Sequence, residues 1–166
     1  MDAHVEPLSE ADRTYMRDLA PDLYGSEIVV SRGIAHRVAE LEGFCAWRGT
    51  RRMGIATYRI DGNRCELVTI DAYVQWHGIG SRLIAAVERA AEDAGCDSIW
   101  LITTNDNVDA LRFYQRRGYR IAAAHLGAIE ASRAIKPQIP HIGFYGIAIR
   151  DELELHKGLA PKRLTG

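Results

Sequence analysis

The sequence predicts an α/β protein built on one mixed sheet, with an antiparallel N-terminal meander, a βαβα crossover after it, and helices on both faces. The first indication is a series of β-type runs at residues 43–48, 53–58 and 65–72, separated by turn residues at 49–52 and 61–63. The second is a change of apolar period, since residues 80–94 repeat at helical spacing and end at Gly95. The third is the continuous apolar run at 98–103, which predicts a strand covered on both faces and parallel to the 65–72 strand.

The remaining elements follow from local signals. Residues 9–20 begin with a cap signal at Ser9 and precede Pro21, so they predict a first helix that ends before the proline. Residues 27–31 are either a strand or the approach to one. A helix over 108–117 starts after Asn107 and closes at Gly118, and strand character resumes over 119–125. Within the punctuated segment 126–146, residues 129–135 favour a helical turn, and 147–155 predict a last strand of alternating polarity.

Length and composition are those of one globular domain. The chain has 166 residues, 47% hydrophobic and 26% charged, which fits a single domain over 1–166. A formal net charge of -1 gives no basic footprint for nucleic acid and no field that attracts an anionic membrane surface. No run reaches the roughly 18 apolar residues that span a bilayer, and charged residues interrupt the first twenty positions. We therefore expect a cytoplasmic protein with no nucleic-acid partner and no membrane contact.

The cysteines indicate a reducing compartment. Cys45, Cys65 and Cys96 are odd in number and lack the spacing of a metal site or a CxxC pair. We expect them to be small buried side chains. No metal site is expected.

The segment between the 65–72 strand and the next helix carries the clearest functional signal. Gly78 and Gly80 allow a sharp turn and a close approach to a ligand, and the helix behind them presents free N–H groups and a positive dipole end. This arrangement suits a phosphate or pyrophosphate. A dinucleotide fingerprint would need glycine where Leu83 stands, and a P-loop would need a lysine between Gly80 and Ser81. What remains is the spacing Gln-x-x-Gly-x-Gly at residues 75–80.

This motif resembles the pyrophosphate loop of the GNAT superfamily of N-acetyltransferases, Gln/Arg-x-x-Gly-x-Gly/Ala. In that family a strand–Asn–helix unit follows, with a Tyr seven residues after the Asn, and Asn107 and Tyr114 stand at that separation. The resemblance runs through about residues 43–125, and the final strand extends it. The whole chain is similar to an uncharacterised bacterial branch of the superfamily, which names no substrate. The resemblance implies one acetyltransferase domain that uses acetyl-CoA as co-substrate.

The resemblance also implies which residues bind the cofactor. The strand before the loop splays from its parallel neighbour in GNAT folds, so backbone groups of Val68, Thr69 and Ile70 would bind the pantetheine arm; the alternative is a plain buried strand. The pyrophosphate loop corresponds to Gln75, Trp76, His77, Gly78, Ile79, Gly80 and Ser81, which act mainly through backbone N–H groups. The His77 side chain is then a solvated loop residue rather than a base. The 3′-phosphate would be approached by Arg112, Arg116, Arg117 or Arg120, each of which also fits a solvated basic face.

Two residues have implied roles near the thioester. Asn107 would bind the cofactor amide or cysteamine region, and it also fits the N-cap of its helix. Tyr114 would protonate the departing thiolate, and its alternative is core packing, since it lies three residues after Leu111 on an amphipathic helix.

The general base does not transfer from the family. In many GNAT enzymes it is a Glu five residues before the Asn, where this chain has Ile102. Glu66 and Asp71 are the nearest carboxylates in the sequence, and burial would raise the pKa of either toward a useful range. Solvent-facing carboxylates, a base acting through water, and no base at all stay open as alternatives.

A small-molecule primary amine is the expected acceptor, with a peptide or protein amino group second. A non-catalytic acyl-CoA binding or sensing module is a rival of another class, and a dehydrogenase is disfavoured by Leu83. We expect the acceptor site where the first helix, the meander and residues 126–146 meet. That segment carries a mixed set of side chains that selects no substrate charge: Glu130, Arg133, Lys136, His141 and Tyr145. Its alternative role is a subunit contact in a homodimer, with Phe144 and Tyr145 at the interface.

Overall fold

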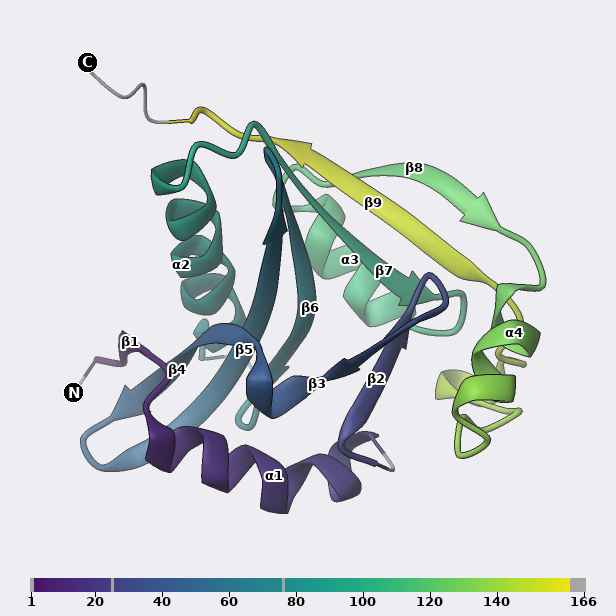
Figure 1. Cartoon of the computed structure of the whole chain (residues 1–166), viewed down its shortest axis with the longest axis horizontal. Coiled ribbons are helices and arrows are strands. Elements are labelled where there is room, and N and C mark those ends of the chain that lie inside the picture. The colour runs from purple at the N-terminus through teal and green to yellow at the C-terminus, as the bar shows by residue number, and fades with distance from the viewer. Residues whose placement is uncertain (1, 25, 76, 162–166) are drawn as a thin grey trace.

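A computed structural model provides the structure of the chain and describes residues 2–24, 26–75 and 77–161 (Figure 1). Within these residues the main sheet has seven strands, of which only the pair β6–β7 is parallel. In sheet order they are β1 (His4–Pro7), β4 (Glu42–Arg48), β5 (Arg51–Asp61), β6 (Arg64–Ala72), β7 (Ser98–Thr104), β9 (Glu152–Gly158) and β8 (Arg120–His125). The predicted meander is β4–β5–β6, and the predicted crossover joins β6 to β7, so the mixed α/β class is confirmed.

Helices cover both faces of this sheet, as predicted. The four α-helices are α1 (Glu10–Tyr24), α2 (Ile79–Asp93), α3 (Val108–Gln115) and α4 (Ala128–Ile135), with short 3₁₀ turns at Val38–Glu40 and Phe144–Gly146. Neighbouring residues of β5 point to opposite faces: Ile55 packs in a cluster with Met16 of α1, and Ala56 packs in the larger cluster with Leu83 of α2. The meander therefore lies between α1 and α2.

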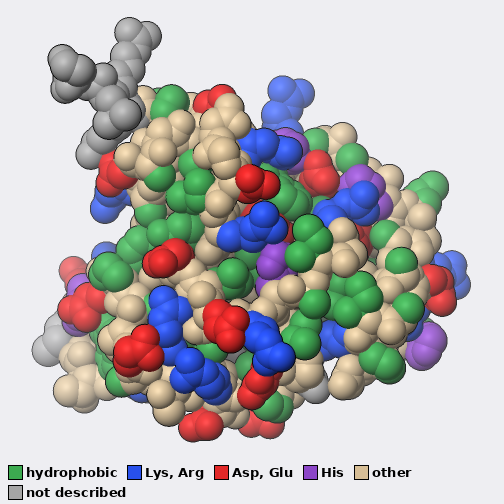
Figure 2. Space-filling view, viewed as in Figure 1, with side chains coloured by type: hydrophobic (Ala, Val, Ile, Leu, Met, Phe, Trp, Pro, Cys, Tyr) green, Lys and Arg blue, Asp and Glu red, His purple; other side chains and the backbone are tan. Residues whose placement is uncertain are grey.

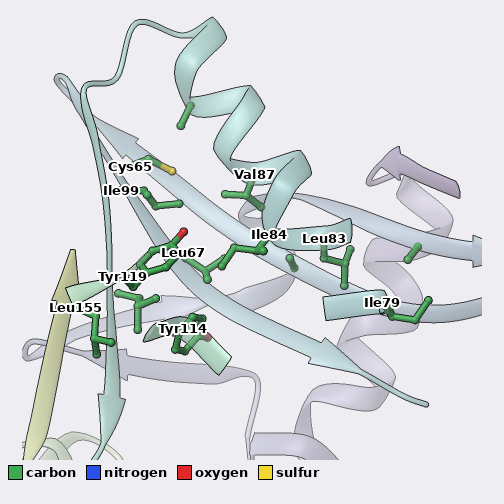
Figure 3. Packing of buried hydrophobic residues seen from close by; sticks show 14 of the residues in the cluster. Cys65, Leu67, Ile79, Leu83, Ile84, Val87, Ile99, Tyr114, Tyr119 and Leu155 are labelled. Carbon is green, nitrogen blue, oxygen red and sulfur yellow. The ribbon is translucent and has the colours of Figure 1, made fainter. Parts of the chain in front are cut away.

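The larger cluster joins α2 and α3 to the sheet. Its buried side chains come from β4, β5, β6, β7 and β9 and from both helices, and those labelled in Figure 3 include Leu67, Leu83, Val87, Ile99, Tyr114, Tyr119 and Leu155. The three cysteines are buried and unpaired, which confirms their expected role as small core side chains. Burial raises the pKa of the Cys45 and Cys65 thiols to about 12, so neither is a reactive thiolate at neutral pH.

The parallel pair β6–β7 is short and then opens. Its register runs from Arg64 opposite Ser98 only as far as Leu67 opposite Leu101. Beyond that point β7 pairs with β9 and β6 pairs with β5, and a register shift between Thr57 and Tyr58 leaves Val68 unmatched on β6. Figure 1 shows the two strands diverging toward their carboxyl ends. The expected splay is present.

A two-stranded hairpin, β2 (Ile28–Ser31) and β3 (Ile34–Arg37), crosses in front of the main sheet (Figure 1). Its turn residues Arg32 and Gly33 both have positive φ, 49° and 75°, as tight hairpin turns require. The Ser31 hydroxyl donates a 2.7 Å hydrogen bond to Glu66 on β6, so the hairpin covers the α1 side of the sheet next to the splay.

Several details differ from the sequence predictions. The first helix passes through Pro21 to Tyr24, because a proline in the last turn removes only one intrahelical bond while Ala20 and Tyr24 gain buried contacts. β7 is buried at Ile99 and Leu101 and half-buried at its five other positions, so its second face is covered only in part. The strand β1 and the second hairpin strand β3 were not predicted.

The last strand begins at Glu152, five residues later than predicted. Residues 147–149 instead bond back to 141–143, with the Gly143 amide donating to the Ile147 carbonyl at 2.8 Å and the Ile149 amide to the His141 carbonyl at 2.9 Å. The predicted helical turn inside this segment is α4.

The surface carries charges of both signs. On the face drawn in Figure 2, acidic and basic side chains are interspersed along the lower edge, where α1 lies in Figure 1. Among the helices of the described ranges, none combines the length and the apolar character that crossing a bilayer requires.

Candidate active site

A first cleft of about 730 Å³ lies between the start of α2 and one side of α3. It is lined by the end of β6, the loop after it, the first turn of α2 and the polar side of α3: Ala72, Val74, Gln75, Gly78, Ile79, Gly80, Ser81, Asp109, Arg112, Phe113, Arg116 and Arg117. Most members of the predicted pyrophosphate loop therefore line this cleft. Trp76 lies outside the described residues, and the His77 side chain is exposed, as expected for a solvated loop residue.

Backbone geometry at the start of α2 presents free N–H groups, which are hydrogen-bond donors, to one side of this cleft. Gly78 is the N-cap of α2 with φ 71° and ψ 12°, a conformation that favours glycine. The first intrahelical bond runs from the Arg82 amide to the Gly78 carbonyl at 3.1 Å, so the amides of residues 79–81 have no partner within the helix. A Cβ on Gly80 would lie 3.1 Å from the Phe113 ring, which explains why the smallest residue stands where α2 approaches α3.

Basic side chains of α3 and of the two residues after it form the opposite wall. Arg117 stacks on the Phe113 ring with its guanidinium carbon 3.6 Å from the ring centroid, and it donates to the Ser81 hydroxyl. Arg112 lies 3.9 Å from Asp109, the one carboxylate in the lining. Arg120 is on β8 opposite His156 and does not line the cleft. The fold therefore separates it from Arg112, Arg116 and Arg117, the other arginines considered for the 3′-phosphate. Helix-terminal amides facing three arginines fit a diphosphate group.

A second cleft of about 470 Å³ lies on the other side of the splay. It is lined by the end of α1, the first hairpin strand, the end of β7, and α4 with the residues after it: Tyr24, Val29, Val30, Ile102, Thr103, Thr104, Asn107, Ile129, Ser132, Lys136, Gln138, Ile139, Pro140, Ile149 and Glu152. The expected junction of the first helix with segment 126–146 is present, but β2 and β7 take the place expected for the meander.

The splayed strand ends and the start of α3 contribute lining residues to both clefts. Ala72 of β6 lines the first cleft and Ile102 of β7 lines the second, so each splayed strand end borders one of them. The first turn of α3 does the same, with Asp109 in the first cleft and Asn107 in the second.

Asn107 has the cap role weighed from the sequence. Its side-chain oxygen accepts the Ala110 amide at 3.4 Å and starts α3. Because Asn107 also lines the second cleft, the cap holds the side chain at that position and does not conflict with ligand contact.

Tyr114 is part of the core. It is 7% exposed, and its ring centroid lies 5.3 Å from that of Phe113 and 5.6 Å from that of Tyr119 (Figure 3). Burial, together with the nearby Asp71 carboxylate, raises the pKa of the Tyr114 hydroxyl, so the phenol keeps its proton at neutral pH. The packing role considered from the sequence is present, and the phenol has the protonation state that an acid requires.

Asp71 is connected to the second cleft. Its carboxylate accepts a hydrogen bond from the Tyr24 hydroxyl, and Tyr24 lines that cleft. Burial raises the pKa of Asp71, although the Tyr24 bond opposes the rise. Asp71 thus links Tyr24, to which it is hydrogen-bonded, with Tyr114, whose pKa it raises; of these three residues near the splay, Tyr24 lines a cleft and the other two lie behind the lining.

Glu66 has a different environment. It is 3% exposed, which contradicts the alternative of a solvent-facing strand carboxylate. Besides the Ser31 hydroxyl, the Arg59 guanidinium and the His36 Nε2 atom lie 3.9 Å and 4.0 Å from its Oε2 atom. Burial raises the pKa of Glu66 while Ser31 and Arg59 oppose the rise. Glu66 lines neither cleft.

Three residues of the second cleft were missed or undervalued by the sequence interpretation. Tyr24 lies beyond the predicted end of the first helix, and Glu152 resembles any polar position of an alternating strand. Lys136 was one of a mixed set and had no distinguishing pattern. Each of these residues is placed in the cleft by contacts between segments that are distant in sequence. A local sequence pattern contains no signal for such contacts.

Comparison with known proteins identifies related chains. Residues 5–119 match the family model described as "Acetyltransferase (GNAT) family". The chain is 42% identical over 155 residues to "Uncharacterized protein YdhI" of Bacillus subtilis (strain 168), covering 92% of this chain and 96% of that protein. It is 45% identical over 60 residues to the blasticidin-S acetyltransferase of Streptomyces morookaense, covering 36% of this chain and 43% of that enzyme.

Solved structures share the fold. A GNAT family acetyltransferase from Elizabethkingia anophelis with acetyl-CoA bound superposes with a TM-score of 0.70 at 19% identity, covering 95% of this chain and 99% of that one. At this identity the likeness concerns the fold alone.

Proposed function

Because the chain belongs to the acetyltransferase (GNAT) family, we propose that it transfers an acetyl group from acetyl-CoA to the primary amine of a small molecule. Membership makes the chain an acetyl-CoA-dependent acetyltransferase. The acceptor class and the residue roles are the proposal.

One observation carries this proposal: the splay of β6 and β7 is bordered by a donor-rich cleft on one side and by a second cleft on the other. Acyl transfer needs two reactants held in contact, and such positioning alone supplies a large share of catalysis. Acetyl-CoA, when bound, supplies an activated acyl thioester. Its diphosphate suits the amides of residues 79–81 together with Arg112 and Arg116, and the backbone of residues 68–70 faces the opened seam where an extended arm would lie.

Proton handling is assigned to Tyr114, Asp71 and Tyr24 near the splay. Tyr114 keeps its proton and is the donor to the departing thiolate. Asp71 is the proposed acceptor of the amine proton, with Tyr24 as its link to the second cleft, because burial raises its pKa toward the value a base needs. Glu66, the other carboxylate weighed from the sequence, is enclosed by the hairpin and is the weaker assignment.

The size of the second cleft favours a small acceptor. A volume of about 470 Å³ is within the range of small-molecule sites, and β2 and α4 enclose it from two directions. The match to the blasticidin-S acetyltransferase, an enzyme named for a small-molecule acceptor, supports the same class.

The test combines binding and turnover. Calorimetry with CoA measures the first cleft, and thiol release from acetyl-CoA is then followed across small primary amines and across peptides with free amino termini. We expect CoA to bind and at least one small amine to be acetylated with a kcat/KM at least tenfold above every peptide. Absence of CoA binding by the folded protein would overturn the donor site, and a preference for peptides would overturn the acceptor class. N-acetylated forms of the same amines are the control and should release no thiol.

A further inference from the structure

The second cleft contains a buried ammonium group that has no counter-charge among the described residues. Lys136 is 8% exposed and lies at the end of α4. Its Nζ atom donates a 2.8 Å hydrogen bond to the Ile28 carbonyl of β2. An ammonium has three N–H donors, so this bond leaves two of them. Among the described residues, no carboxylate lies at ion-pair distance from Lys136.

Glu152, the one carboxylate lining this cleft, is already balanced. It is 2% exposed, and its Oε1 atom accepts the Ser132 hydroxyl at 3.0 Å. Its Oε2 atom lies 3.7 Å from a guanidinium nitrogen of Arg32, at the hairpin turn. Arg32 therefore supplies a counter-charge to Glu152 by ion pairing, while Oε2 accepts no hydrogen bond from the described residues. With Glu152 and Arg32 paired, Lys136 is the charged side chain of the described cleft lining that has no ionic partner.

An uncompensated ammonium in this position is costly for the fold alone. Burial without a paired charge disfavours the ionised form, and desolvation lowers the pKa of Lys136 accordingly. Tethering β2 to α4 needs only one donor to the Ile28 carbonyl, which a neutral side chain can supply. The positive charge and the two further donors are explained if an anion enters the cleft.

We propose that Lys136 binds an anionic group, a carboxylate or a phosphate, on the acceptor, so that the preferred substrate carries an amine and an anion in the same small molecule. This deepens the proposed function and rests on it. The geometry supports the assignment, because Lys136 lines the same cleft as Ile102 and Asn107 at the splay, where the amine would react. Lys136 would hold one end of the acceptor while the other end reaches the splay.

The test uses matched acceptor pairs in the thiol-release assay. Each amino acid is compared with its amide, and phosphoethanolamine with ethanolamine, which separates the carboxylate from the phosphate. For the best pair we expect kcat/KM at least tenfold higher for the anionic member, mainly through KM. Lys136→Met should reduce that ratio to about one, and Lys136→Arg should retain part of it. Lys157→Met is the control, because Lys157 pairs with Glu88 on another part of the molecule and should leave the ratio unchanged.

A binding measurement keeps the inference testable without turnover. Straight-chain carboxylates from acetate to hexanoate, and the matched alcohols, are titrated calorimetrically into the protein–CoA complex. We expect heat from at least one carboxylate, none from its alcohol, and loss of that heat in a folded Lys136→Met variant. Carboxylate binding with no acetylated amine would overturn the proposed acceptor class and leave the anion site. Two results would overturn the anion site and leave the acetyltransferase. One is a higher kcat/KM for the neutral member of every acceptor pair, and the other is an equal loss of kcat/KM for both members in Lys136→Met.

Discussion

At Tyr114 one substitution can remove the proposed acid group and keep the packing of the side chain. Replacing it by phenylalanine keeps the ring between Phe113 and Tyr119 and removes only the hydroxyl. We expect Tyr114→Phe to bind CoA as the unsubstituted protein does, by calorimetry. We expect its kcat to fall by roughly 10²–10⁴-fold in the thiol-release assay, the usual contribution of a positioned acid.

Tyr119→Phe is the matched control. Tyr119 is buried in the same cluster, and its hydroxyl bonds to Glu88 at 2.9 Å, outside both clefts. Loss of this hydroxyl in Tyr119→Phe should reduce the free energy of unfolding by about 1 kcal/mol, as loss of a hydrogen bond does, and should leave kcat unchanged. Equal activity of the two variants would contradict the acid role of Tyr114.

Glu66 makes a prediction about stability and pH. Its pKa is raised in the folded protein, so its favourable contribution is complete below the unfolded value, near 4.5, and is lost as the pH rises through the folded pKa. Glu66→Gln removes this loss and keeps an oxygen for the Ser31 hydroxyl. We expect the variant to have the same free energy of unfolding as the unsubstituted protein at pH 4 and a higher one at pH 8.

Denaturant unfolding at several pH values measures this difference. Glu42→Gln, at an exposed position of β4, is the control and should show no such divergence. A Glu66→Gln variant less stable at pH 8 than the unsubstituted protein would mean that the Arg59 and His36 contacts outweigh the cost of burying the charge.

Among the elements, the start of α2 is the one on which cofactor binding depends. The Cβ introduced by Gly80→Ala would lie 3.1 Å from the Phe113 ring, so α2 and α3 must separate slightly and the amides of residues 79–81 must shift. We expect CoA to bind about tenfold more weakly, equivalent to about 1.4 kcal/mol, by calorimetry. Gly158→Ala is the control, because a Cβ there meets nothing within 4 Å and CoA affinity should not change.

Elements defined by local signals were predicted well. The apolar stripe of α2, its glycine-rich start and the meander strands each depend on residues close in sequence. β1 and β3 are only four residues long and form because they meet β4 and β2, which no short pattern encodes. The continuation of α1 past Pro21 likewise depends on tertiary contacts of its last turn.

The same distinction applies to the clefts. The loop at residues 75–81 was recognisable because its glycines act through local backbone geometry. The second cleft is assembled from segments far apart: Lys136 bonds to Ile28, 108 positions away, and Ser132 meets Glu152 across 20 positions. These long-range contacts determine which charged side chains have an ionic partner. The sequence alone therefore predicted only a mixed set of charged and polar side chains in segment 126–146.

For the molecule as a whole, the critical seam is between β6 and β7, which share only four registered pairs before they diverge. This seam joins the meander half of the sheet to the half formed by β7, β9 and β8. A cofactor that contacts α2, α3 and the open strand ends would connect the two halves. Its binding should therefore stabilise the folded chain as well as occupy the first cleft.

We expect CoA at one hundred times its Kd to raise the free energy of unfolding by about 2.7 kcal/mol, which thermal or denaturant unfolding measures. Hydrogen exchange should slow at the amides of residues 68–72 and 79–81, and hardly change on β1, at the far edge of the sheet. Dephospho-CoA, which lacks the 3′-phosphate, should raise the free energy of unfolding less than CoA does. Because Arg116 lines the cleft, Arg116→Ala should reduce this difference in stabilisation between CoA and dephospho-CoA. Protection confined to α3, without residues 68–72, would mean that the pantetheine arm does not lie in the seam.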